Sequence, residues 1–190
     1  MTLLNNMIWG TCHTVLDQDT CFRNMNGFAS SLKTQCATEL SQRSTFVINA
    51  LNGLTLYGVS RDAGCLSNPA TNVYCYSQAA ASSNPSDLYF YQIQYGINIP
   101  NDTKPTCSSC TKSLMNLYVS EVSGQDKFQD EDLRSTLAEA YSHASKIAIN
   151  MCGEGFVPRI AIDNGSPALS LSLSSLWFAL LIGCISVVIF

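Results

Sequence analysis

Two cysteines separated by two residues, Cys107 and Cys110, have the spacing found in thiol redox enzymes. A CxxC pair at a helix start can have a lowered thiol pKa and can exchange disulfides. Redox pairs of this kind usually follow a strand in a βαβ unit, and the sequence around Cys107 predicts none. We therefore expect Cys107 and Cys110 to lie one helical turn apart and to form disulfides with two different elements.

Other residue types that support catalysis or metal binding are sparse. The chain has two histidines, His13 and His143, and no second CxxC, so the ligand spacing of a zinc site is missing. The acidic run Asp130-Glu131-Asp132 lacks the spacing of a calcium loop and suits a helix N-terminus, where acids complement the macrodipole. We expect His143 to be solvated or hydrogen bonded. No GxSxG, HExxH, P-loop or GxGxxG motif occurs, so we expect no catalytic residue, metal or cofactor and no enzyme.

Eight of the nine cysteines precede an apolar C-terminal tail, and the ninth, Cys184, lies within it. An even set of cysteines in one modest domain is typical of a disulfide framework in an oxidising compartment. Eight cysteines allow about 105 pairings, and the sequence does not choose among them. Each bridge is expected to stabilise the fold by about 2–4 kcal/mol. The expected disulfide cysteines are Cys12, Cys21, Cys36, Cys65, Cys75, Cys107, Cys110 and Cys152.

The C-terminal segment from Asn164 to Phe190 carries no charged residue. The segment begins with the small cluster Asn164-Gly165-Ser166, continues with a Ser/Leu spacer and ends with the apolar run Leu176–Phe190. This order is typical of a glycosylphosphatidylinositol (GPI) anchor signal. We predict attachment at Asn164, because Gly165 and Ser166 after it are small. The alternative is a retained single-span helix, but a span needs about 20 apolar residues and usually a basic cytoplasmic flank.

The N-terminal residues and a glycosylation sequon bear on whether the chain enters the secretory pathway. Residues 1–11 contain no convincing secretory signal, so we expect them to be the remnant of a longer N-terminal region. The sequon Asn101-Asp102-Thr103 lies between two prolines and predicts an exposed, N-glycosylated loop at Asn101. A cytosolic protein with an apolar tail is the alternative, and the cysteine usage argues against it.

Composition limits the remaining function classes. Charged residues make up 13% of the chain and the net charge is −4, with no basic patch, so we expect no nucleic-acid partner. The length suits one core. We expect a helical ectodomain over residues 12–156, a linker and attachment region over 157–175, and a hydrophobic tail helix over 176–190.

Apolar spacing predicts helices along most of the ectodomain. Asp17 or Asp19 is a candidate N-cap for the first helix and Thr106 for the fourth. The expected helices are 17–34, 44–59, 71–82 (with Asn68-Pro69 at its start), 107–122 and 130–152. The aromatic-rich segment Leu88–Tyr95 alternates and predicts an extended loop across the helices. The expected fold is an all-α, disulfide-linked bundle of four or five helices.

An aromatic set could line a groove for a glycan or lipid, or pack in the core. Its members are Tyr74, Tyr76, Tyr89, Phe90, Tyr91 and Tyr95.

Five segments contain distinctive motifs: Ala63–Pro69, Asn72–Tyr76, Pro85–Tyr91, Lys104–Cys110 and Ile149–Gly153. In these motifs the chain resembles an uncharacterised fungal family of secreted, eight-cysteine domains. The resemblance implies a fungal surface protein, often with a lipid anchor, and no established activity. A second fungal group, eight-cysteine haem-binding domains, is similar only in cysteine count and location, because its CxC and its Asp before a cysteine are missing here.

These features together favour a lipid-anchored fungal cell-surface or cell-wall protein with a structural or interaction role. Its expected partners are the membrane, through the anchor or tail helix, and cell-wall glycan or protein. The alternative is a small-ligand module that binds a lipid, a sterol or haem, and the third is a thiol oxidoreductase acting through Cys107 and Cys110.

Overall fold

A computed structural model describes residues 2–124 and 130–160, and within them the chain is all-helical apart from one isolated bridge, Ser67–Tyr74. Asn164 and the run Leu176–Phe190 lie outside the described residues, as does Cys184. The helices are α1 (Thr2–Cys12), α2 (Gln18–Gln35), α3 (Ala37–Ser41), α4 (Thr45–Thr55), α5 (Tyr57–Cys65), α6 (Cys75–Ala81), α7 (Ser86–Tyr89), the 3-10 helix η1 (Phe90–Tyr95), α8 (Ser109–Ser123) and α9 (Glu131–Cys152). The all-α prediction is confirmed, with more and shorter helices than expected.

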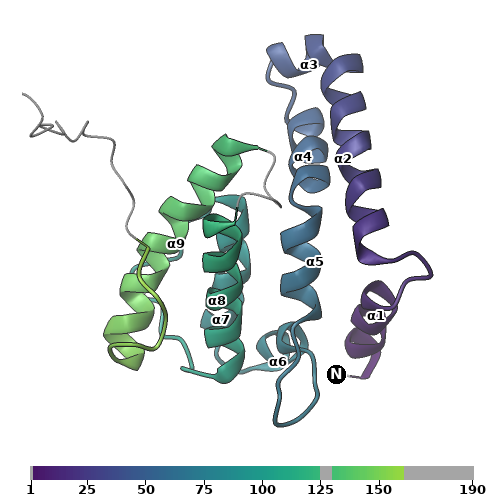
Figure 1. Cartoon of the computed structure of the whole chain (residues 1–190). Helices are drawn as coiled ribbons and strands as arrows, with labels where there is room; N and C mark the ends of the chain where they lie inside the picture. The colour runs from purple at the N-terminus through teal and green to yellow at the C-terminus, as the bar shows by residue number, and fades with distance from the viewer. Residues whose placement is uncertain (1, 125–129, 161–190) are drawn as a thin grey trace, which may run out of the picture.

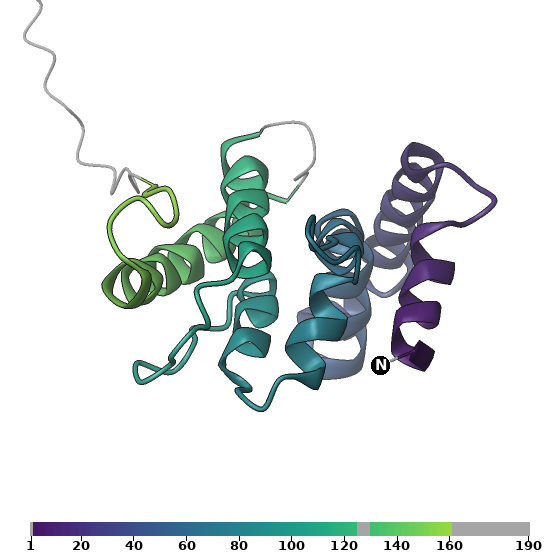
Figure 2. The same cartoon turned by 90° about the horizontal axis from the view of Figure 1, so that it is seen from below.

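The longer helices lie side by side in a curved row. Figure 1 shows α2 beside α4, with α5 continuing the line of α4, and α8 beside α9. Figure 2, seen from below, gives the same order from α1 and α2 through α4 and α5 to α8 and α9. The short helices α6 and α7 connect the α5 part of the row to α8.

The core lies in the C-terminal part of this row, between α5, η1, α8 and α9. In α9, Leu137, Tyr141, Ala144 and Ala148 recur at three- and four-residue steps and are fully buried, which is the stripe expected of a core-facing helix. From α8, Tyr118 joins them, and its hydroxyl donates to the carbonyl of Phe90 at 3.1 Å. Aromatic burial with a satisfied hydroxyl therefore links α8 to η1.

The helix ends agree well with the cap signals in the sequence. Asp17 caps α2 and accepts a hydrogen bond from the backbone of Thr20, which with the Thr20 hydroxyl lowers the pKa of the carboxyl group. Asp130, predicted as the start of the last helix, is the N-cap of α9, and Gly124 and Gly153 follow the ends of α8 and α9. These signals depend on local hydrogen bonds, so a short window of sequence contains them.

The N-terminal hairpin of α2 and α4 is thinly packed by comparison. Each helix has one buried residue, Ala29 in α2 and Val47 in α4. Phe28 and Phe46 are 59% and 84% exposed. Because little apolar area is removed from water here, this hairpin contributes less to stability than the α8–α9 pair.

The predicted extended segment Leu88–Tyr95 is wrong, because the chain is helical there, in α7 and η1. Burial follows the three-residue step of a 3-10 helix, because Phe90 and Ile93 are both fully buried. It does not follow the alternation of the tyrosines. Gly96 then ends η1 in the left-handed conformation, with φ at 71°.

Other boundaries also differ from the predictions. The expected helix 44–59 is present as α4 and α5, interrupted at Leu56 and extended to Cys65. The helix expected from Thr71 begins at Cys75, because the Asn68 side chain accepts from the backbone N–H of Ala70 and holds a turn. Ser108, not Thr106, caps α8.

Two short helices, α1 and α3, were not predicted. At the other end of the domain, Val157, assigned to the linker, is buried in the core, and the Tyr141 hydroxyl donates to the carbonyl of Pro158 at 2.6 Å. Packed structure therefore extends on both sides of the expected boundaries at residues 12 and 156.

Replacing Gly96 by Ala should lower the free energy of unfolding by about 1–3 kcal/mol. The backbone there has a positive φ, and an added Cβ would collide with Cγ2 of Thr136 on α9. Chemical denaturation of the purified chain measures the change.

Gly53→Ala is the matched control, because a Cβ at this position in α4 meets nothing within 4 Å. This variant should gain about 0.5–1 kcal/mol from the lower backbone entropy of its unfolded state. Equal effects of the two substitutions would contradict the geometry at Gly96.

Candidate functional site

The CxxC cysteines belong to two different disulfides. Cys107 pairs with Cys152, and Cys110 pairs with Cys75, with Cα–Cα distances of 5.5 and 5.3 Å. The first bridge joins the segment before α8 to the end of α9, and the second joins α6 to α8. A third bridge, Cys12–Cys65, holds α1 against α5. Since Cys107 and Cys110 do not face each other as a dithiol pair, their spacing here serves cross-linking.

Among the described residues, Cys21 and Cys36 are free thiols, so three bridges replace the four expected. The physical reason is their placement on one helix. Cys21 lies in the first turn of α2 and Cys36 at its C-cap, so 15 residues of helical rise separate them by about 22 Å. Disulfide geometry requires Cα atoms within about 7 Å.

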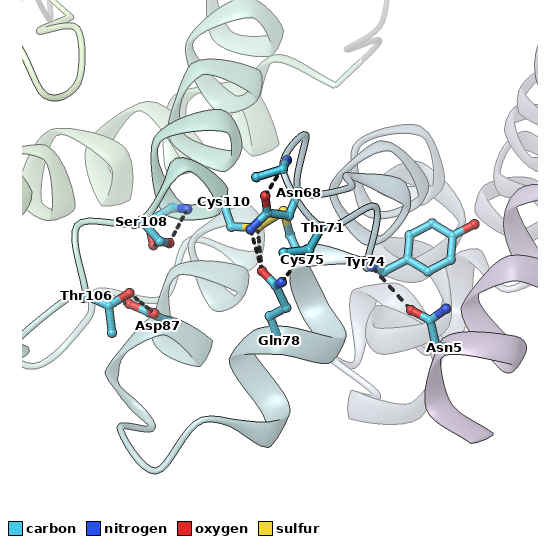
Figure 3. Close-up of a disulfide and its surroundings, with 12 residues drawn as sticks. Asn5, Asn68, Thr71, Tyr74, Cys75, Gln78, Asp87, Thr106, Ser108 and Cys110 are labelled. Atoms are coloured by element: carbon cyan, nitrogen blue, oxygen red, sulfur yellow. Dashed lines mark hydrogen bonds between the residues drawn. A yellow bond between two sulfur atoms is a disulfide. The ribbon is translucent and has the colours of Figure 1, made fainter. Parts of the chain in front are cut away.

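A polar network surrounds the Cys75–Cys110 bridge (Figure 3). Gln78 on α6 accepts from the Asn68 amide at 3.0 Å and donates to the Thr71 hydroxyl at 2.9 Å. On the other side of the bridge, Asp87 accepts from the backbone and hydroxyl of Thr106. These bonds hold the loops before α6 and α8, and a hollow of about 150 Å³ remains between them.

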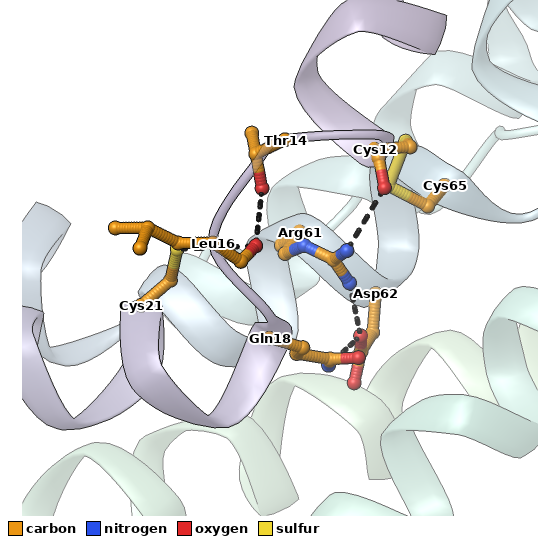
Figure 4. Close-up of polar contacts among 8 residues, drawn as sticks. All are labelled: Cys12, Thr14, Leu16, Gln18, Cys21, Arg61, Asp62 and Cys65. Atoms are coloured by element: carbon orange, nitrogen blue, oxygen red, sulfur yellow. Dashed lines mark hydrogen bonds and ion pairs between the residues drawn. A yellow bond between two sulfur atoms is a disulfide. The ribbon is translucent and has the colours of Figure 1, made fainter.

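Arg61 on α5 links the N-terminal helices to the rest of the fold (Figure 4). Its guanidinium donates to the carbonyl of Cys12 at 3.0 Å and lies 3.7 Å from the carboxylate of Asp62. Asp62 also accepts from the amide of Gln18 on α2. One arginine therefore bridges α1 to α5 beside the Cys12–Cys65 bond. A hollow of about 600 Å³ adjoins it, lined also by Trp9 and by His13, whose ring stacks on Trp9.

The remaining candidates for chemistry have structural partners. His143 on α9 is hydrogen bonded through Nε2 to the carbonyl of Ile99 at 2.9 Å. Asp130 caps α9 and lies 3.2 Å from the ammonium group of Lys33 on α2. Within residues 2–124 and 130–160, no three His, Cys, Asp or Glu side chains gather in the way that a metal ion needs.

Three members of the aromatic set come together in a groove between α5, α6, α7 and η1, which we call the tyrosine groove. Tyr76 and Tyr91 meet edge to face, with ring centroids 5.0 Å apart, and Tyr95 forms part of the rim at 49% exposure. The groove has a volume of about 430 Å³, within the range of small-molecule sites. Its lining residues are Ser60, Gly64, Tyr76, Leu88, Tyr91, Gln92, Gln94 and Tyr95.

Gln94 lines the tyrosine groove with an unsatisfied polar atom. The side chain is 6% exposed, and its Oε1 is buried with no hydrogen-bond partner in the described part of the chain. A buried acceptor without a partner costs about 1–3 kcal/mol. Such a cost marks Gln94 as a candidate for contact with a ligand.

Burial, followed by the nearby Asp87 carboxylate, raises the pKa of Tyr91 above its ordinary value. Its hydroxyl is therefore protonated throughout the physiological range and can both donate and accept.

The other aromatic residues of the set have different positions. Phe90 is fully buried in the core, Tyr89 packs against it, and Tyr74 lines the hollow beside Arg61. The sequence analysis did not identify Ser60 or Gln94 as groove residues. An extended segment at 88–95 gives no reason to group Gln94 with Tyr91 and Tyr95, and no local pattern brings Ser60 on α5 next to them. Helical spacing from Tyr91 to Gln94 and Tyr95 is the signal that could have found it.

The predicted glycosylation site lies on a turn. Asn101 is exposed, and Thr103 is 4% exposed, with its hydroxyl donating to the carbonyl of Pro100. A glycan on Asn101 would thus extend into solvent without disturbing the core.

No helix in the described ranges is long and apolar enough to cross a membrane. The sequence profile of a family described as a domain of unknown function (DUF7729) matches residues 1–161. No curated protein and no solved structure matches the chain.

Replacing Cys107 and Cys152 together by Ser should lower the free energy of unfolding by about 2–5 kcal/mol, because the bridge closes a long loop around α8 and α9. Urea denaturation under non-reducing conditions measures it.

The matched control replaces Cys21 and Cys36 together by Ser. These thiols are unbridged, so the change should stay within about 0.5 kcal/mol. A loss for this control as large as for the first pair would mean that Cys21 and Cys36 are also cross-linked.

Proposed function

The chain belongs to the DUF7729 family, a domain of unknown function, and we propose from this premise that it is a non-catalytic interaction module displayed at the fungal cell surface. In this proposal the disulfide-linked helical domain lies outside the membrane. The C-terminal tail supplies the attachment, through a lipid anchor at Asn164.

The observation that carries the proposal is the set of three disulfides. Each joins segments 35 to 53 residues apart, and together they involve α1, α5, α6, α8 and α9. Structural disulfides persist in oxidising compartments and are rare in the cytosol, where thiols are kept reduced. A framework of this kind supports secretion and an extracellular working environment.

A non-catalytic role is supported by what the reactive side chains do. Cys107 and Cys110 are held in separate bridges, so the CxxC motif lacks the internal disulfide that thiol exchange uses. Asp130 caps a helix, and His143 is bonded to a backbone carbonyl. The third alternative, a thiol oxidoreductase, thus has no geometric support at this site.

The attachment part of the proposal rests on composition. Uncharged residues from Asn164 to the apolar run Leu176–Phe190 match the small-residue, spacer and tail pattern of a GPI signal. The resemblance to secreted fungal domains agrees with this arrangement.

A second candidate function is the binding of a small ligand at the tyrosine groove. The specific observation in its favour is the buried, unpartnered Oε1 of Gln94 among three tyrosines. The volume of the groove, about 430 Å³, is within the size range of small-molecule sites.

Phosphatidylinositol-specific phospholipase should release the protein from intact cells into the medium, because cleavage of a lipid anchor leaves no membrane-spanning segment. Immunoblotting of medium and cell pellets measures the release. Replacing Ser166 by Trp should prevent attachment and abolish phospholipase-dependent release, since the anchor signal requires small residues there. Retention of the natural chain on treated cells would instead favour a spanning tail helix.

Asn101 should carry an N-linked glycan when the chain is expressed through the secretory route, because its sequon lies on an exposed turn. Digestion with an N-glycosidase should increase electrophoretic mobility, and Asn101→Gln should remove that shift while leaving thermal stability unchanged. If N-glycosidase does not change the mobility of a chain whose three disulfides are formed, Asn101 is unmodified and the prediction is wrong.

A further inference from the structure

We propose that the tyrosine groove binds a neutral sugar ring, such as one pyranose unit of a glycan. In this arrangement Tyr95 and Tyr76 pack against the C–H face of the ring, and Oε1 of Gln94 accepts a hydrogen bond from a sugar hydroxyl. The inference rests on the second candidate function above and names its ligand class.

The uncharged lining of the groove disfavours charged ligands. Among the described residues, its lining contains no charged side chain, so an anionic or cationic group would lose its hydration without gaining an ion pair. The Asp87 carboxylate, which lies near Tyr91, accepts from Thr106 and lines the neighbouring hollow. Phosphate headgroups and nucleic acids are therefore poor ligands, and an uncharged molecule fits best.

The polar groups of the groove distinguish a sugar from a lipid. Of the described lining residues, Leu88 alone is aliphatic, whereas Ser60, Gln92 and Gln94 present hydroxyl and amide groups beside the tyrosines. An acyl chain or a sterol would leave these hydroxyl and amide groups without partners. A sugar ring has apolar C–H faces for aromatic rings and hydroxyls at its edges, so it can satisfy both.

Gln94 provides the most specific part of the inference. Gln94 lines the groove and its Oε1 is buried without a partner, so a rotation of the amide toward the groove would let a ligand hydroxyl donate to an atom that the fold leaves unpaired. Tyr91 lines the groove from the same 3-10 helix, and its ring meets that of Tyr76 edge to face. One amide beside these rings can orient a bound sugar.

The groove is held in place before any ligand arrives. Phe90 and Ile93 are fully buried, which fixes η1 against α8 and α9. The edge-to-face contact of Tyr76 and Tyr91 joins η1 to α6. Preorganised side chains reduce the entropy lost on binding.

The test is titration of the full chain, purified in detergent, with neutral linear hexasaccharides of glucose, N-acetylglucosamine and mannose in separate experiments. Isothermal calorimetry measures affinity, and saturation-transfer NMR maps the sugar protons nearest the aromatic rings. At least one saccharide should bind saturably. Tyr95→Ala and Gln94→Leu should each weaken it about tenfold, the loss expected for one aromatic contact or one hydrogen bond.

Phe46→Ala is the matched control, because it removes an exposed aromatic ring on α4, away from the groove. Its affinity should equal that of the natural chain. Circular dichroism checks that every variant is folded, and Tyr95→Ala, at an exposed position, keeps the test valid if Gln94→Leu is unstable.

Three outcomes would overturn the inference: no saccharide binds, binding is insensitive to Tyr95→Ala and Gln94→Leu, or a sterol or fatty acid binds in their place with the same sensitivity. Thiol alkylation of the same sample separates this failure from failure of the surface-protein proposal. Intact disulfides without saccharide binding would reject the ligand class alone, whereas free Cys107, Cys110 and Cys152 thiols would reject the extracellular role.

Discussion

The covalent bond between Cys107 and Cys152 is the constraint on which the rest of the structure depends. It joins the residue two positions before α8 to the last residue of α9, so the two helices that hold most of the core share a fixed end. Cys107 itself has a φ of 56°, an unfavourable value for a residue with a side chain. The bridge and the bonds of Thr106 to Asp87 over-determine this conformation.

The other two bridges extend this arrangement toward the N-terminus. Cys75–Cys110 attaches α6 to α8, next to the core, and Cys12–Cys65 attaches α1, which has no buried residue, to α5. Without a cross-link, α1 would be a short helix with little packing to hold it. At α1 the Cys12–Cys65 bridge thus substitutes for apolar burial. The tyrosine groove lies between these two regions, on elements that the core and the Cys75–Cys110 bridge hold in place.

Local signals in the sequence predicted the parts of the fold that depend on local interactions. The cap at Asp17, the helix start at Asp130 and the helical spacing of apolar residues in α9 are contained in a few turns of chain, and the structure confirms them. The prediction of an extended segment at Leu88–Tyr95 failed because the alternation of its tyrosines matched a strand by chance. Burial of Phe90 and Ile93 against distant helices decided the helical conformation. Tertiary packing overrides a short-range pattern in such cases. The cysteine partners and the approach of Tyr76 to Tyr91 are likewise long-range facts, which no local pattern contains.

The proposed extracellular location requires that Cys107 and Cys110 are oxidised into separate cross-links. The most direct measurement is a disulfide map by mass spectrometry of the full chain, alkylated before any reduction and isolated from the cells that make it. The account predicts linked peptides for Cys12–Cys65, Cys75–Cys110 and Cys107–Cys152, with Cys21 and Cys36 alkylated. A bridge between Cys107 and Cys110, or alkylation of all six paired cysteines, would contradict it.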